Sequence, residues 1–149
     1  MKEYTFDDIK TIVRPRLGDE VPLTLFRILR IIGMRSLLGE SSGQTLYMMG
    51  KSVGNMLGAA TVDEFKEKIT ELKIGIPEIE TVEDDHLIVK LYECITCAGF
   101  VSTGELFCDM ESGVMAGLLE KVYGKRAKST QTKSWSMGFN YCEFDIFLY

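Results

Sequence analysis

Hydrophobic residues recur with a helical period through the first half of this 149-residue chain and alternate through most of the second half. This spacing predicts helices over 5–13, 22–37 and 61–72, and another from the turn at 39–43 to about 57. Strands are predicted over 79–82, 87–94, 127–136 and 141–149, with one helix between them at 109–123. We therefore predict an α+β fold, with helices packed on one antiparallel β-sheet. A chain of this length forms one domain, 1–149, with a helical part, 1–76, and a strand-rich part that contains the cysteines, 77–149.

The segment 22–37 is the most apolar part of the chain, yet it carries Arg27, Arg30 and Arg35. Its apolar residues form a broad face, which predicts a central helix with the arginines on a charged outer face. The arginines interrupt the run well before the about 20 apolar residues of a membrane span. No membrane partner is therefore expected.

Glycine recurs every four residues at Gly50, Gly54 and Gly58, in and just beyond the helix that ends near 57. Each glycine inside a helix costs about 1 kcal/mol relative to alanine, so a packing role is expected. The missing side chains would let another backbone come close. That backbone belongs either to another helix of the same chain or to a second copy of the protein.

All four cysteines lie in the strand-rich part, at Cys94, Cys97, Cys108 and Cys142. Cys94 and Cys97 form a Cys-x-x-Cys pair at a strand end, where both sulfurs can turn toward one metal ion. Cys108 directly precedes a helix, whose N-terminal dipole favours the thiolate, and Cys142 lies on the last strand. We predict a structural zinc held by these four residues. Two alternatives remain, namely separate buried thiols that act as small apolar side chains, and a redox pair.

The charge balance argues against a nucleic-acid partner. The chain has 17 basic and 22 acidic residues, a net charge of −5, and no region with a strong basic excess. The first eight residues lack the apolar stretch of a signal peptide, so a cytoplasmic location is expected. Cysteines in that compartment are expected to be thiols or metal ligands rather than disulfides.

Motifs for catalysis are missing from the sequence. His86 is the only histidine, and its place after an acidic turn predicts an exposed side chain. Without it, neither a Ser-His-Asp set nor a Cys-His set can be assembled. No glycine-rich nucleotide-binding loop follows a strand, so no site for a hydride donor is expected. We predict no catalytic residues, and a zinc with four cysteine ligands would leave no open position for water or substrate.

The methionine content favours a binding cavity. Eight methionines are many for this length, and methionine adapts to irregular ligands, although it also fills gaps in ordinary cores. Met48 and Met49 lie on a helix expected to face the core, Leu118 on the inner side of helix 109–123, and Trp135 beside the cysteine region. We predict that these four residues line an apolar pocket of roughly 300–1,000 Å³, the usual range for ligand sites.

Four stretches of the chain resemble the 4-vinyl-reductase domain family, also described as predicted hydrocarbon-binding proteins. They are Glu93-Cys94, Cys108 to Gly117, Met137 to Phe144 and, earlier, Tyr47 to Gly54. The resemblance implies a fold like that of the transport-particle (TRAPP) subunits, usually paired as a homodimer. It also implies binding of a small hydrophobic molecule, since the domain in aromatic-sensing regulators binds phenol-like ligands beside a zinc. Other members are linked by name to reduction of a vinyl group.

The chain departs from the family's zinc motif at two positions. Gln131 stands where the resemblance places a glutamate ligand, and Ser134 where it places a cysteine. The site is therefore either lost or completed by Cys94 and Cys97, and we prefer the second reading. The predicted function is non-catalytic binding of a hydrocarbon-like or aromatic molecule, as a stand-alone sensor or carrier stabilised by a cysteine-ligated zinc. The alternatives are a vinyl-group reductase and a protein-interaction subunit of a larger assembly.

Overall fold

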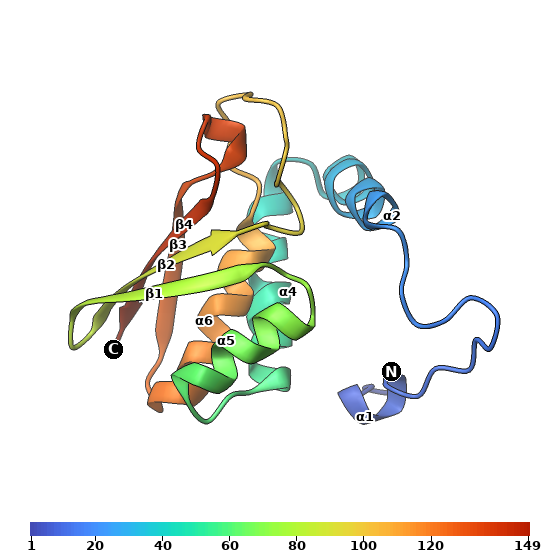
Figure 1. Ribbon diagram of the computed structural model, residues 1–149, viewed down its shortest axis with the longest axis horizontal. Coiled ribbons are helices and arrows are strands. Elements are labelled where there is room, and N and C mark those ends of the chain that lie inside the picture. Colours follow the sequence, from blue (N-terminus) through green and yellow to red (C-terminus); the bar gives the residue numbers. More distant parts are fainter.

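A four-stranded antiparallel sheet forms one layer of the molecule, and two helices cover one of its faces (Figure 1). The computed structural model describes residues 1–149. The strand order is β1-β2-β4-β3, with β1 at Ile76–Glu83, β2 at His86–Tyr92, β3 at Ala127–Lys133 and β4 at Cys142–Leu148. The helices on the sheet are α5, Val62–Glu71, and α6, Asp109–Tyr123, and α4, Ser42–Leu57, packs on α6. The predicted α+β fold is confirmed.

The core lies between the sheet and α6, and the strand register builds it. Leu87 pairs with Ile146, Val89 with Phe144 and Leu91 with Cys142 across the two central strands, and all six side chains are buried. Alternate residues point to the same face of a strand, so this register brings two apolar faces together. The helices α5 and α6 supply the other half of the core.

Glycines bring α4 and α6 into direct backbone contact. A Cβ added at Gly50 would overlap the carbonyl oxygen of Met110, and one at Gly54 would overlap that of Val114. In return, Gly113 and Gly117 of α6 lie against the carbonyl oxygens of Tyr47 and Lys51. The glycine repeat therefore serves packing within the chain. The remaining glycine of the repeat, Gly58, caps the end of α4 with a φ of 62°.

Two local signals have different outcomes. Thr61 caps α5 as predicted, because its hydroxyl accepts a hydrogen bond from the backbone N–H of Glu64. Ser41 makes no such cap for α4, since its hydroxyl instead donates to the carbonyl of Leu38 at 2.8 Å. That bond closes the short 3₁₀ turn η2, Gly39–Ser41, immediately before α4.

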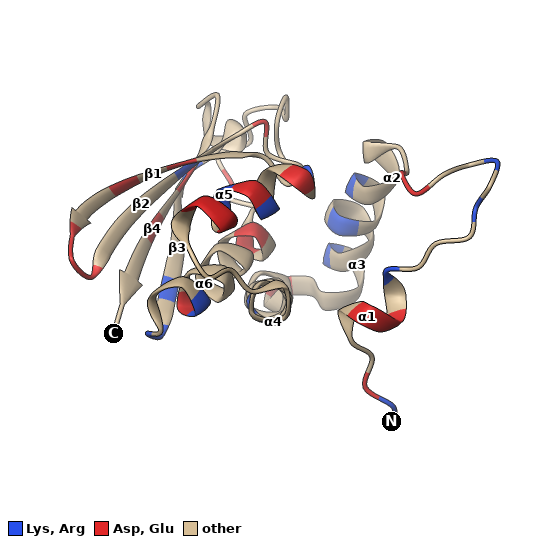
Figure 2. Cartoon of the chain, turned by 60° about the horizontal axis from the view of Figure 1, so that its bottom comes forward, with Lys and Arg blue, Asp and Glu red and all other residues tan.

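Residues 23–38 form one helix outside the two layers, and we call it the arginine helix. It consists of α2, Leu23–Arg27, a π-helical stretch η1, Ile28–Gly33, and α3, Met34–Leu38. The prediction of a central helix is wrong, because the apolar residues Leu25, Ile28, Leu29 and Ile32 are exposed. Figure 2 shows the basic segments on the side turned toward the rest of the domain. The amphipathic pattern is thus reversed relative to the chain's own core.

The first residues lie apart from the sheet, as Figure 1 shows. Within them α1, Phe6–Ile9, is shorter than predicted and is capped by Thr5 and Asp8. Most of the large exposed apolar side chains of the molecule lie between residues 1 and 57. None of the helices combines the length and the apolar composition that a membrane crossing requires.

Candidate metal centre

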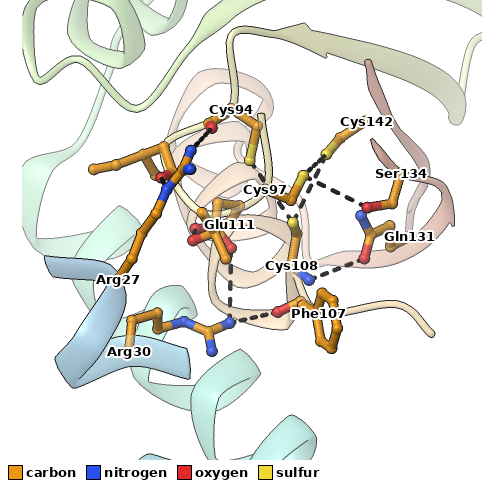
Figure 3. Close-up of polar contacts among 12 residues, drawn as sticks. Arg27, Arg30, Cys94, Cys97, Phe107, Cys108, Glu111, Gln131, Ser134 and Cys142 are labelled. Atoms are coloured by element: carbon orange, nitrogen blue, oxygen red, sulfur yellow. Dashed lines mark hydrogen bonds and ion pairs between the residues drawn. The ribbon is translucent and has the colours of Figure 1, made fainter. Parts of the chain in front are cut away.

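Four segments that are distant in sequence bring the cysteines together. Cys94 and Cys97 lie in the turn after β2, Cys108 lies directly before α6, and Cys142 begins β4. All four side chains are fully buried and reduced. Their sulfur atoms all lie within 4.8 Å of one another. The four residues predicted as metal ligands therefore form one cluster (Figure 3).

The distances between sulfurs fit a tetrahedral zinc site. Four ligands at the usual Zn–S distance would place their sulfurs about 3.8 Å apart. Cys108 Sγ lies 3.7 Å from both Cys94 Sγ and Cys142 Sγ, and Cys97 Sγ lies 3.0 Å from Cys142 Sγ. A shift of a few tenths of an ångström to about 1 Å would complete a regular tetrahedron. Four thiolates are also the donor set of many structural zinc sites.

Backbone hydrogen bonds shape the turn that carries two of the ligands. The N–H of Ala98 donates to the carbonyl of Cys94 at 3.0 Å, and the N–H of Phe100 donates to that of Cys97 at 2.8 Å. Glu93 precedes the turn with a φ of 52°, a conformation that is uncommon for a residue with a side chain. This sharp change of direction at the end of β2 turns both sulfurs inward.

Without a metal, the buried sulfurs share their protons unequally. Hydrogen bonds from Cys108, Cys142 and Cys94 lower the pKa of Cys97 far below the usual thiol value. Hydrogen bonds with Cys142 and Cys94, together with burial, raise the pKa of Cys108 well above it. The cluster therefore favours one thiolate among neutral thiols. Binding of Zn²⁺ would release the remaining protons, since the ligand form of cysteine is the thiolate.

The two positions that depart from the family motif contact the cluster without belonging to it. The side-chain carbonyl of Gln131 accepts a hydrogen bond from the backbone N–H of Cys108 at 3.0 Å. The hydroxyl of Ser134 donates to Cys97 Sγ over 3.5 Å. Both residues thus orient ligands rather than replace them, and the sulfurs of Cys94 and Cys97 occupy the space beside them.

Two residues of the arginine helix reach the cluster, and neither was predicted from the sequence to belong to the site. The guanidinium of Arg27 donates to the carbonyls of the turn that carries Cys94 and Cys97. Arg30, which is 5% exposed, donates to the carbonyl of Phe107, the residue before Cys108. Arginines within an otherwise apolar helix were the only sequence signal for these contacts.

A buried carboxylate lies between Arg30 and the cysteine turn. Glu111 accepts a hydrogen bond from the hydroxyl of Thr96, and its Oε2 lies 3.8 Å from Arg30 Nη2 without a hydrogen-bond partner. Burial raises the pKa of Glu111, and the opposing effects of Arg30 and Thr96 are smaller. The group therefore links α6, the cysteine turn and the arginine helix through polar contacts inside the protein.

His86 lies away from the cysteine cluster, and its predicted exposure is wrong. It begins β2, is half-buried, hydrogen-bonds to the carboxylate of Asp145 and stacks on Phe147 with ring centroids 4.3 Å apart. These contacts cross from β2 to β4. They give the only histidine of the chain a place in sheet pairing.

The four residues predicted to line a ligand pocket are not brought together. Met48 and Met49 are 56% and 38% exposed on the outer face of α4, whereas Leu118 is buried in the core. Trp135 begins the 3₁₀ turn η3, Trp135–Met137, next to Ser134, and its Nε1 is buried without a hydrogen-bond partner. None of the four lines the three largest cavities.

Those cavities lie elsewhere and differ in character. The largest, about 380 Å³, lies between α4, α6 and β3 and has mostly polar walls, including Asp109 and Lys128. A cavity of about 370 Å³ lies beside the arginine helix, lined by Ile28, Ile31, Ile32 and Phe100 among others. Another apolar one, about 310 Å³, lies at the start of that helix. The apolar space of the protein thus follows the arginine helix rather than α4.

The fold and the cluster define a class of protein, a helix-and-sheet domain with a buried set of four cysteine metal ligands. Residues 87–147 match the model of the 4-vinyl-reductase domain. The uncharacterized protein MJ1642 of Methanocaldococcus jannaschii is 31% identical over 130 residues, which is 87% of this chain and 80% of that protein. The chain belongs to the 4-vinyl-reductase domain family.

Solved structures share the fold at low sequence identity. A vinyl-4-reductase family protein from Methanocaldococcus jannaschii superposes with a TM-score of 0.73 at 21% identity, covering 90% of this chain and 85% of the other. The phenol-responsive sensory domain of the transcription activator PoxR, solved with phenol, gives 0.67 at 15%, covering 86% and 75%. A trafficking protein particle complex subunit 3 from Naegleria fowleri, covalently bound to palmitic acid, gives 0.62 at 15%, covering 85% and 95%. The predicted TRAPP-subunit-like fold is confirmed.

Proposed function

We propose that this protein binds a small hydrophobic molecule without transforming it, as a cytoplasmic homodimer whose four-cysteine cluster holds a structural zinc. The observation that carries the binding role is the apolar cavity of about 370 Å³ beside the arginine helix. Its size lies within the range of ligand sites, roughly 300–1,000 Å³. Two structural neighbours, with phenol and with palmitic acid, hold molecules of this kind.

The metal part of the proposal rests on the sulfur geometry. Four thiolate ligands would leave zinc no open position, so the ion would cross-link β2, α6 and β4 rather than activate water. A reducing compartment, such as the cytoplasm, would keep the four cysteines available as ligands. The zinc would thus stabilise the end of the sheet that faces the arginine helix.

The dimer part rests on the exposed apolar surface. Leu25, Leu29 and Ile32 on the arginine helix and Met48 and Met49 on α4 all lie exposed in the single chain. Monomeric proteins rarely expose contiguous apolar patches larger than a few hundred Å². In this proposal a second copy of the chain covers these residues, and Met48 and Met49 approach a bound ligand only in the assembled dimer.

Native mass spectrometry of freshly purified full-length protein tests the three parts together. We expect the mass of two chains with two zinc ions and a copurified small molecule. After removal of that molecule, phenol or palmitic acid should raise the unfolding temperature, because a ligand at 100 times its dissociation constant stabilises a protein by about 2.7 kcal/mol. A protein that carries no molecule and responds to neither compound would contradict the binding role.

The same experiment separates the two alternative functions. A copurified nucleotide or flavin would favour the vinyl-group reductase. The exposed apolar surface of residues 1–57 favours the interaction subunit as the second candidate. A monomer without a ligand, with that surface still exposed in solution, would support it.

A further inference from the structure

We propose that Arg27 and Arg30 are positioning residues for the metal cluster, and that metal binding fixes the arginine helix to the rest of the domain. The inference rests on the proposed zinc site. It adds a physical link between that site and a helix that carries no metal ligand.

Arg27 contacts the cysteine turn only through its main chain. Its Nε donates to the carbonyl of Ile95 at 2.9 Å, and its Nη2 donates to that of Ala98 at 3.0 Å and that of Cys94 at 3.4 Å. A rigid, planar guanidinium can satisfy three carbonyls only if they keep one arrangement. That arrangement is the closed turn in which Cys94 and Cys97 point toward the other two sulfurs (Figure 3).

Arg30 contacts the segment that carries the third ligand. Its Nη2 donates to the carbonyl of Phe107 at 2.6 Å and lies 3.8 Å from the Oε2 of Glu111. Arg30 follows Arg27 at the i, i+3 spacing, so both lie on one face of the helix. One helix thus holds both cysteine-bearing loops, before and after the stretch that connects β2 to α6.

The arginine helix has few other attachments to the domain. Its inward apolar residues, Phe26, Ile31 and Met34, are only half-buried, and it packs against α4 mainly through α3. The hydrogen bonds of Arg27 and Arg30 therefore form a large part of what holds it. Without metal, thiol hydrogen bonds alone would close the turn, and these are weak. Opening of the turn would remove the acceptors of Arg27 and release the helix.

Hydrogen–deuterium exchange on the full-length protein, with zinc and after chelation, tests this link. In the wild type we expect the amides of residues 28–38 to exchange at least about tenfold faster after zinc removal, as a locally released segment does. Arg27→Met should show fast exchange in this helix even with zinc bound. Its zinc affinity should fall about tenfold, as is typical when a group that orients ligands is lost.

Two further variants and one internal reference sharpen the result. Arg35→Met is the matched control, because Arg35 lies on the same helix but pairs with the exposed Glu105 at 3.1 Å, and it should behave like the wild type. Arg27→Lys keeps the charge without the planar group and should fall between the two. Helix α6 should stay slow in every sample, which shows that the domain remains folded.

Three outcomes would overturn the inference. Exchange in the arginine helix that does not change on zinc removal would separate the helix from the metal, with the proposed zinc site intact. Faster exchange throughout α6 would mean that the domain unfolds as a whole instead of releasing one helix. A wild type that binds no zinc would contradict the proposed site itself, and with it the link.

Discussion

At the scale of single residues, the cysteine cluster is the feature that the sequence predicted best. Four cysteines in one half of the chain, two of them in a Cys-x-x-Cys pair, indicated a common site, and the structure places their sulfurs within 4.8 Å of one another. The surrounding polar contacts could not be predicted. Arg27 binds main-chain oxygens, and every residue has one, so no residue type in the turn marks the contact.

Loss of a single cysteine should abolish metal binding. We expect about one zinc ion per chain in the wild type and only a small fraction of that in Cys108→Ser or Cys142→Ser, because serine is a poor zinc ligand. Elemental analysis of the folded proteins measures this. Ser134→Ala is the matched control, since Ser134 touches Cys97 Sγ but does not belong to the cluster, and it should keep its zinc. Full zinc content in both cysteine variants would remove these residues from the site.

At the scale of helices and strands, local signals predicted elements better than they predicted orientation. The bounds of α6 and the inner face of β4 follow directly from apolar spacing and from Gly124, the left-handed residue at the end of α6. The orientation of the arginine helix could not be found in this way. Apolar spacing shows which face is to be buried but not which chain buries it, so Leu29 and Ile32 were assigned to the wrong core.

The contact between α4 and α6 should tolerate no added methyl group. Gly113→Ala would drive a Cβ into the carbonyl of Tyr47, and overpacking of this kind costs about 3 kcal/mol when the backbones cannot separate. Gly33→Ala is the control, because its Cβ would lie 3.7 Å from the nearest atom, the carbonyl oxygen of Ile28. It should be neutral or stabilise the protein by up to about 1 kcal/mol. Urea unfolding of both variants measures the difference, and equal midpoints would contradict it.

At the scale of the whole molecule, the structure has a well-packed part and a part whose apolar surface faces outward. Residues from 59 onward supply nearly the entire core, whereas most of the large exposed apolar side chains precede residue 58. The single chain therefore accounts for the sheet and its helices but not for the outer surface of the arginine helix. That surface depends on an assembly, and a single sequence records assembly only indirectly.

A charge placed on the exposed face of the arginine helix should separate the two copies. Leu29 is 60% exposed, so Leu29→Glu leaves the single chain intact but would put a carboxylate into the proposed interface, at a cost of several kcal/mol. Light scattering coupled to size-exclusion chromatography should give a dimer for the wild type and a monomer for this variant. Val101→Glu, at a 70% exposed site elsewhere, should remain dimeric. A wild type that runs as a monomer would refute the assembly.

The grip of Arg27 on carbonyl oxygens also affects how this stretch can change over time. Ile95 and Ala98 offer the arginine nothing but peptide groups, which any replacement would supply equally well. Mutations at those two positions can therefore accumulate, within the limits of local packing, without weakening the attachment. The variable letters between and beside Cys94 and Cys97 would then say little about whether the attachment persists in a related chain, and the arginine would be the residue to look for.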